Sequence, residues 1–356
     1  MAGEPVSPLP AWQTLTDEQS RRWTEVLAHV TNALPAGAVT VVVDGGTAHA
    51  AVVADRLADA LHRGGRPCAR LTDRAPVVDE DNWRADGTVD TVAVADGPRW
   101  RARPPTGEWD VVVWLRTPPV GPSTNGGRGP ECDIVVDLHD PTWPVIRHLA
   151  DRLAPQERWY LSESRAFFAT RAATWDTKFG DDLPAYAAAV TEAGLAEGGV
   201  VVDIGCGTGR ALPALRDAVG PHGVVIGLDL TPQMLTAAHA HAGRADADLI
   251  LGDARHLPLA DASVDAVFAA GLLTHLPDPE SGLRELARIT RPGGRLVLFH
   301  PSGRAALAAR HGRPLRPDEP LAETRLRGTT ARAGWRLLGY DDPPHRFFAT
   351  AVRQRG

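Results

Sequence analysis

Residues 200–210 read Val-Val-Val-Asp-Ile-Gly-Cys-Gly-Thr-Gly-Arg. The apolar and mostly β-branched residues around Asp203 suit a strand that is buried on both faces of a parallel sheet. Glycines follow at alternating positions, 205, 207 and 209, and residues 211–219 have the pattern of a helix. A strand, a glycine-rich turn and a helix place bare backbone at the carboxyl edge of a sheet. We therefore expect a ligand site at this turn.

Length and composition indicate a soluble protein of two domains. The chain has 356 residues, which is longer than a single core usually extends. Its formal net charge of −6 comes without a basic run, so neither nucleic acid nor an anionic membrane is an expected partner. No apolar run is long enough to span a membrane, and the N-terminus lacks the pattern of a signal peptide. The three scattered cysteines fit the reducing cytoplasm and lack metal-ligand spacing.

The first half of the chain predicts a small α/β domain over residues 1–155. Apolar runs that suit strands alternate with stretches of helical periodicity. The expected helices are 17–33, 50–63 and 144–153, and the expected strands are 39–43, 67–71, 89–94, 110–115 and 134–136. The helix at 144–153 should end where Ala-Pro-Gln-Glu-Arg begins, so we place the second domain at residues 156–356.

A second glycine turn follows the expected strand 39–43 and reads Asp-Gly-Gly-Thr at 44–47. Its place before a helix resembles the P-loop of uridine and nucleoside kinases. Such a loop needs a lysine and a serine or threonine for phosphate and magnesium, and here alanine and valine stand in their place. The only lysine of the chain is Lys178. We expect a degenerate, non-catalytic kinase-like domain, in which Asp73 is a turn residue rather than a catalytic acid.

The turn at 205–209 and the strand ends after it resemble the class I S-adenosylmethionine-dependent methyltransferases over about residues 165–353. The spacing of the glycines differs from the dinucleotide fingerprint, which has its third glycine three places after the second. The resemblance implies a Rossmann-like sheet of seven strands, the last two of them antiparallel, and S-adenosyl-L-methionine as cofactor. It also places the chain among methyltransferases of small molecules.

The expected cofactor site combines residues from several strand ends. Asp229 stands at the end of an apolar strand. An acid at this position can accept hydrogen bonds from both ribose hydroxyls of the cofactor. The resemblance assigns Asp253 to the adenine amine and gives Met234 an adenine contact, although a core position for Met234 is an equal alternative. Trp175 is expected either to cap the cofactor or to pack in the core. The predicted set is Trp175, Asp203, Gly205, Cys206, Gly207, Gly209, Asp229, Leu230, Met234, Asp253, Ala254, Ala270 and Gly271.

Two histidines follow strands of the second domain, and either could serve as the catalytic base. His275 follows the fourth strand and His300 the fifth. A base is needed only where the acceptor must lose a proton of high pKa, and structural roles for both remain open. Four arginines at 304–316 would suit an anionic acceptor if they face inward, and are surface residues otherwise; they are Arg304, Arg310, Arg313 and Arg316.

These features predict a cytoplasmic methyltransferase that acts on a small molecule, such as a secondary metabolite, by in-line displacement. Two alternatives remain open at this point. One is a scaffold or binding protein without catalysis, and the other is a bifunctional kinase and methyltransferase. A homodimer is also left open, and the identity of the acceptor cannot be read from the sequence.

Overall fold

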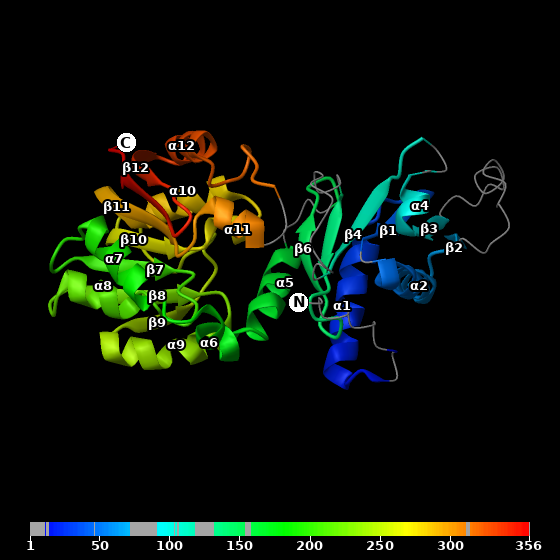
Figure 1. Ribbon diagram of the computed structural model, residues 1–356, viewed down its shortest axis with the longest axis horizontal. Helices are drawn as coiled ribbons and strands as arrows, with labels where there is room; N and C mark the ends of the chain where they lie inside the picture. Colours follow the sequence, from blue (N-terminus) through cyan, green and yellow to red (C-terminus); the bar gives the residue numbers. More distant parts are fainter. Residues whose placement is uncertain are drawn as a thin grey trace. The chain divides into compact units, whose positions relative to one another are not determined.

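The computed structural model describes residues 11, 14–45, 47–71, 91–102, 104, 107–117, 132–153, 158–310 and 314–355. It divides the chain into two compact units, Met1–Trp159 and Tyr160–Gly356 (Figure 1). The sequence placed its domain boundary between residues 155 and 156. The predictions for Gly46, Asp73 and Arg313 concern positions outside the described residues.

The first unit is built on a six-stranded sheet in the order β2-β3-β1-β4-β5-β6. The strands β1 to β5 pair in parallel, and β6 is antiparallel to β5. Trp23 of the first helix is fully buried in the core. The elements are α1 Asp17–Ala33, β1 Val39–Asp44, α2 Thr47–Arg63, β2 Cys68–Leu71, β3 Val92–Asp96, α4 Gly97–Arg101, β4 Val111–Arg116, β5 Ile134–Asp137 and β6 Val145–Leu149.

One element of this unit differs in type from the prediction. The helix expected over 144–153 is instead the strand β6, in which Ile146 pairs with Val136 of β5. Val145 and Ile146 are β-branched, and pairing with the edge of an existing sheet favours the extended conformation for such residues. The prediction of a helix was therefore wrong, because the segment pairs with the preceding strand β5, and local helical periodicity does not show such pairing.

The connection between β1 and α2 is short. The strand ends at Asp44 and the helix begins at Thr47, so two residues separate them. Gly45 has a φ of +85°, and a Cβ added there would lie 2.5 Å from the carbonyl oxygen of Leu115. Packing against β4 alone therefore accounts for the glycine at position 45.

The second unit is built on a seven-stranded sheet in the order β12-β13-β11-β10-β7-β8-β9. The number of strands agrees with the prediction. The neighbouring strands β11, β10, β7, β8 and β9 pair in parallel. In contrast, β13 is antiparallel to both β11 and β12. The last strand is thus inserted between β11 and β12, so that β13 alone runs against the others. The strands are β7 Val200–Ile204, β8 Val224–Asp229, β9 Asp248–Leu251, β10 Val264–Ala270, β11 Thr290–His300, β12 Trp335–Asp341 and β13 Phe347–Arg353.

Helices flank this sheet, and its apolar residues form the core. Val201, Phe268 and Val297 lie on adjacent strands and are at most 1% exposed. The helical elements are α5 Arg158–Ala169, η2 Ala172–Thr174, α6 Trp175–Phe179, α7 Leu183–Ala193, α8 Leu212–Val219, α9 Pro232–Ala245, η3 Leu273–His275, α10 Pro279–Ile289, α11 Arg304–Arg310 and α12 Glu323–Arg332.

Among the described residues, no helix has the length and apolar character that crossing a membrane requires. The same residues contain no cluster of three or more histidine, cysteine, aspartate or glutamate side chains that could hold a metal ion.

Candidate functional site

The glycine turn after β7 is a tight structure that exposes backbone. The N–H groups of Gly205 and Cys206 both donate to the carbonyl oxygen of Leu228, at 2.7 and 3.0 Å. Gly205, Gly207 and Gly209 have φ values of +72°, +54° and +83°, in the region that favours glycine. A Cβ added to Gly207 would meet no atom within 4 Å. The turn therefore leaves open space beside Gly207, as a backbone cradle for a ligand requires.

Asp229 joins the end of β8 to this turn. Its Oδ2 accepts the N–H of Gly207 at 2.9 Å, and its Oδ1 accepts the N–H of Thr231 at 2.8 Å. The residue is 8% exposed, and burial raises the pKa of its carboxyl although these hydrogen bonds oppose the shift. Each carboxylate oxygen has a second lone pair, so Asp229 can still accept hydroxyl donors from a ligand.

Asp203, the acid within β7, is buried beside Asp229. It is 2% exposed, and no donor from the described residues reaches its Oδ1. Burial, and then the negative charge of Asp229, raise the pKa of Asp203 to about 8.

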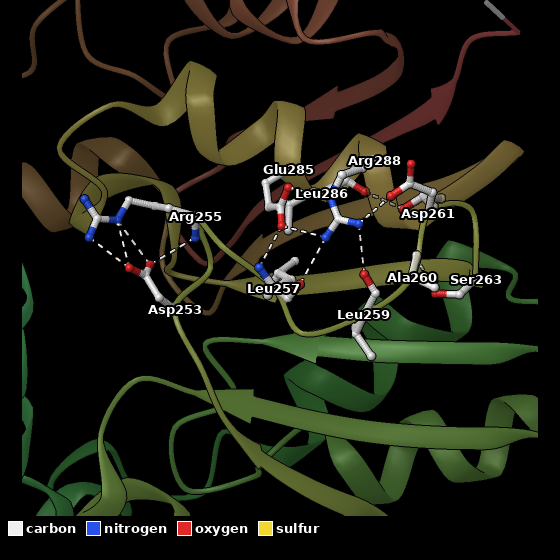
Figure 2. A network of polar contacts seen from close by, with 11 residues as sticks. Asp253, Arg255, Leu257, Leu259, Ala260, Asp261, Ser263, Glu285, Leu286 and Arg288 are labelled. Carbon is white, nitrogen blue, oxygen red and sulfur yellow. Dashed lines mark hydrogen bonds and ion pairs between the residues drawn. The ribbon is translucent and has the colours of Figure 1, made fainter.

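Asp253, at the end of β9, is paired with an arginine that the sequence analysis did not single out. Nε of Arg255 lies 3.1 Å from each oxygen of Asp253, and Nη2 lies 2.8 Å from Oδ2 (Figure 2). Burial would raise the pKa of Asp253, but the hydrogen bonds and charge of Arg255 outweigh it and lower the pKa. The guanidinium also lies over the ring of Tyr160, 4.5 Å from its centre. Asp253 therefore stays ionised as an acceptor.

The loop that follows, between β9 and β10, is held by α10. Oε1 of Glu285 accepts the N–H of Leu257 at 2.6 Å, and Arg288 donates to the carbonyl oxygens of Leu257 and Leu259 (Figure 2). Arg288 also pairs with Asp261 at 2.6 Å. Sequence reasoning missed this network, although the spacing of Glu285 and Arg288 on one helix was a usable signal.

The segment upstream of the turn lies against the carboxyl ends of the strands. Nε of Arg165 on α5 donates to the carbonyl oxygen of Leu230, just after β8, at 3.1 Å. Further along, Oδ1 of Asp176 accepts the hydroxyl of Thr208 at 2.6 Å. The ring of Trp175, which is partly buried, packs 5.9 Å from that of Phe168. Trp175 is thus next to a residue that contacts the glycine turn.

The two candidate bases lie in different surroundings. His275, in η3, packs against aromatic rings of α5, with centre-to-centre distances of 5.1 Å to Phe168 and 6.3 Å to Phe167. His300 ends β11, and its Nδ1 lies 3.0 Å from both the backbone nitrogen and the carbonyl oxygen of Ser302. Ser302 therefore engages Nδ1 in either tautomer. His300 Cδ2 would lie 3.7 Å from a Cβ placed on Gly271, which brings these two predicted residues together.

The remaining predicted residues differ mainly in exposure. Met234 is 1% exposed on α9, which agrees with the core alternative for this side chain. Cys206 and Ala254 are buried as well, whereas Leu230, Ala270 and Gly271 are partly exposed.

Three of the arginines considered for an anionic acceptor make contacts within the protein. Arg304 is buried and pairs with Glu319 and Asp342, each at 3.4 Å. Arg316 pairs with Asp318 at 2.6 Å. Arg310 donates to the hydroxyl of Ser302 at 3.2 Å. The ion pairs of Arg304 and Arg316 favour a structural role for these two residues.

The part of the chain that forms this site is similar to a known protein family. Residues 202–298 match the protein family described as "Methyltransferase domain". This range includes the glycine turn and the ends of β7, β8, β9 and β10.

Several known proteins are similar to less than a third of the chain. An uncharacterized 37.1 kDa protein in transposon TN4556 of Streptomyces fradiae is 42% identical over 101 residues, 28% of this chain and 29% of that protein. An arsenite methyltransferase of Halobacterium salinarum is 36% identical over 109 residues, 30% of this chain and 28% of that protein. A 27-O-demethylrifamycin SV methyltransferase of Amycolatopsis mediterranei is 40% identical over 108 residues, 29% of this chain and 39% of that protein. The chain spans less than half the length of each of these relatives.

The matched range and the observed sheet agree with the resemblance found in the sequence. The observations at the turn also fit the cofactor that it implies, because bare backbone at Gly207 lies beside a buried carboxylate with acceptor capacity. Residues 202–298, which lie within the second unit, thus match a methyltransferase domain, and S-adenosylmethionine is the expected cofactor of such a domain.

Proposed function

We propose that the second unit transfers a methyl group from S-adenosylmethionine to a small-molecule acceptor. The observation that carries this proposal is the link between Asp229 and Gly207. It combines, at one edge of the sheet, a carboxylate for the ribose hydroxyls and open backbone for the rest of the cofactor.

The chain's own residues would hold the cofactor from several strand ends. Asp229 would accept the ribose hydroxyls, and Asp253, kept ionised by Arg255, would accept the adenine amine. The backbone of Gly205 and Gly207 would approach the cofactor closely. Met234 would remain in the core. The other predicted residues would line the same edge; they are Trp175, Asp203, Cys206, Gly209, Leu230, Ala254, Ala270 and Gly271.

When bound, the cofactor supplies an electrophilic methyl group, so the protein contributes mainly alignment for in-line attack and exclusion of water. The acceptor would lie on the side of β10 and β11, where His275 follows β10 and His300 is the last residue of β11. Either histidine would take the acceptor's proton where the attacking atom still carries one. Their surroundings differ, since aromatic rings pack on His275 while Ser302 engages His300.

A small acceptor is favoured by the charge of the chain and by its relatives. The formal net charge is −6 with no basic run, which is unfavourable for a nucleic-acid substrate. Similar proteins include one described as a 27-O-demethylrifamycin SV methyltransferase and one described as an arsenite methyltransferase, and both act on small molecules by those descriptions.

For the first unit we propose a non-catalytic role. Two residues between β1 and α2 are too few to wrap a phosphate in the manner of a P-loop, which needs several residues before its lysine. Gly45 is also explained by its packing against Leu115.

Methyl transfer is tested by incubating the full chain with methyl-labelled S-adenosylmethionine and small-molecule extracts of the source organism. We expect label to pass into a low-molecular-weight product. The matched variant Asp229→Asn should abolish most of that transfer, and Asp217→Asn, an exposed acid on α8, should leave it unchanged. Binding of the cofactor without transfer to any fraction would favour the scaffold alternative instead.

A further inference from the structure

We infer that Arg210 is a positioning residue that clamps residues 176–182 onto the glycine turn, so that this segment closes when the cofactor binds. Arg210 directly follows the last glycine of the turn and is 6% exposed. The segment contains the end of α6 and the connection to α7. The inference rests on the proposed function, because cofactor binding is part of its test.

The contacts of Arg210 all lead to this upstream segment. Nη2 lies 2.5 Å from Oδ1 of Asp182 and 2.6 Å from the carbonyl oxygen of Gly180. Nη1 lies 3.6 Å from Oδ1 of Asp176. One guanidinium therefore donates a hydrogen bond to Gly180 and lies within ion-pair distance of both acids on this segment.

A second contact holds the same segment to the other side of Gly209. The hydroxyl of Thr208, a residue only 1% exposed, donates to Asp176 at 2.6 Å. Gly209 itself is closely surrounded, because an added Cβ would lie 3.0 Å from Leu212 and 3.2 Å from His241. The clamp is therefore anchored on a closely packed part of the turn.

Electrostatics make the clamp depend on closure of the segment. A buried guanidinium is costly unless its charge is matched, and the partners that match it here, Asp176 and Asp182, both lie on the segment. Within the described residues, Nε and Nη1 of Arg210 have no hydrogen-bond partner. Lifting the segment would separate Arg210 from all its partners at once. The segment is therefore expected to open and close as one body.

Coupling to the cofactor follows from the shared backbone. Gly207 borders the open space beside the turn and is held by Asp229, while the next residue, Thr208, holds the segment. A ligand that fixes the conformation of Gly207 also fixes Thr208 and Arg210. By reciprocity, a closed segment strengthens cofactor binding and an open one weakens it.

The test compares Arg210→Met with Arg216→Met in the full chain. Arg216, on α8, is a matched control because it donates to backbone oxygens of Gly220, Gly223, Ala245 and Asp246 and to none of the segment. The measurements are calorimetry with S-adenosylmethionine and amide hydrogen exchange of residues 175–182, with and without it.

In the unmodified protein we expect the cofactor to slow exchange in this segment. Arg210→Met should weaken binding at least tenfold and abolish the cofactor-dependent protection, while Arg216→Met keeps both within threefold even if its Tm falls. Arg210→Lys should recover part of the protection. Asp182→Asn added to Arg210→Met should weaken binding by less than threefold more, because both changes break the same contact.

Equal affinity and equal protection in Arg210→Met and the unmodified protein would overturn the inference. If Arg210→Met does not fold, Thr208→Val tests the second anchor without removing a charge, and unchanged protection there would overturn it as well. If the unmodified protein does not bind S-adenosylmethionine at all, the proposed function fails first, and the two failures are thus distinguishable.

Discussion

The carboxylate of Asp229 accepts the backbone N–H of Gly207 at 2.9 Å, although the two residues belong to different strand–helix connections. This bond ties the end of β8 to the turn after β7, so the acid and the open backbone are fixed relative to each other. The same carboxylate accepts the N–H of Thr231 before α9. A single side chain therefore organises the edge at which the cofactor is proposed to bind.

Replacing Asp229 by asparagine should weaken binding of S-adenosylmethionine by about 10- to 100-fold. The change removes the charge from hydrogen bonds that are each worth about 1.5–3 kcal/mol when a charged group takes part. Calorimetry measures the effect, and Asp217→Asn on the exposed side of α8 serves as control. Equal affinities of the two variants would show that Asp229 does not contact the ligand.

Two glycines of the turn should differ in their tolerance of alanine. Gly207→Ala should cost about 1–2 kcal/mol of stability, because its φ is +54° but space is open around it. Gly209→Ala should cost about 1–3 kcal/mol more, since the new methyl group would meet Leu212 and His241. Urea unfolding of the two variants measures the difference. A smaller loss for Gly209→Ala would contradict the packing of the turn.

The affinity for the cofactor should fall more in Gly207→Ala than in Gly209→Ala, although Gly207→Ala should lose less stability. The methyl group of Gly207→Ala would enter the space proposed for the cofactor, so binding should weaken strongly while the fold persists. Unchanged affinity in Gly207→Ala would place the cofactor elsewhere.

The titration of the buried Asp203 carboxyl group should lower the free energy of unfolding of the second unit as the pH rises. Burial and the charge of Asp229 raise the pKa of Asp203 to about 8, whereas an unfolded chain releases this proton near pH 3.9. Between those values the folded state holds a proton that the unfolded state has lost. The stabilisation is therefore complete below about pH 4 and is lost as the pH rises through 8, with a slope of about 1.4 kcal/mol per pH unit.

Asp203→Asn removes this titration, so its stability should vary less steeply between pH 5 and 7. Hydrogen exchange of the β7 amides across that range reports the unfolding free energy of the second unit. An unchanged slope in Asp203→Asn would mean that Asp203 titrates normally in the folded protein.

The first unit should not bind ATP in the manner of a kinase. The two-residue connection between β1 and α2 has no room for a phosphate loop, and alanine and valine replace its functional side chains. Titration of the full chain with magnesium and ATP should give no heat of binding. Saturable binding that is lost in Gly45→Asp would revive the bifunctional alternative.

The sequence was sufficient for the parts of the fold that depend on local pattern. β-Branched runs gave the strands around Asp203 and Asp229, and the glycines at 205–209 gave the turn, because both features reflect backbone preferences of a few residues. The seven-stranded sheet followed from the resemblance. The prediction failed for β6, where pairing with the preceding strand β5 outweighs the helical periodicity of the segment.

The contacts that position the site could not be read in the same way. Asp182 and Arg210 are far apart in the chain, and only the folded structure shows that they pair. The bond of Asp253 to Arg255 is local, but only the folded structure shows that Arg255 is buried and Asp253 partly buried where they pair. Charge pairing that depends on tertiary proximity is thus the part of the site that sequence patterns leave open.

Calorimetric titration of the full chain with S-adenosylmethionine tests the central claim most directly. Our account predicts saturable binding with one site per chain, and at least tenfold weaker binding in Asp229→Asn. Absence of binding by the folded, unmodified protein would contradict it.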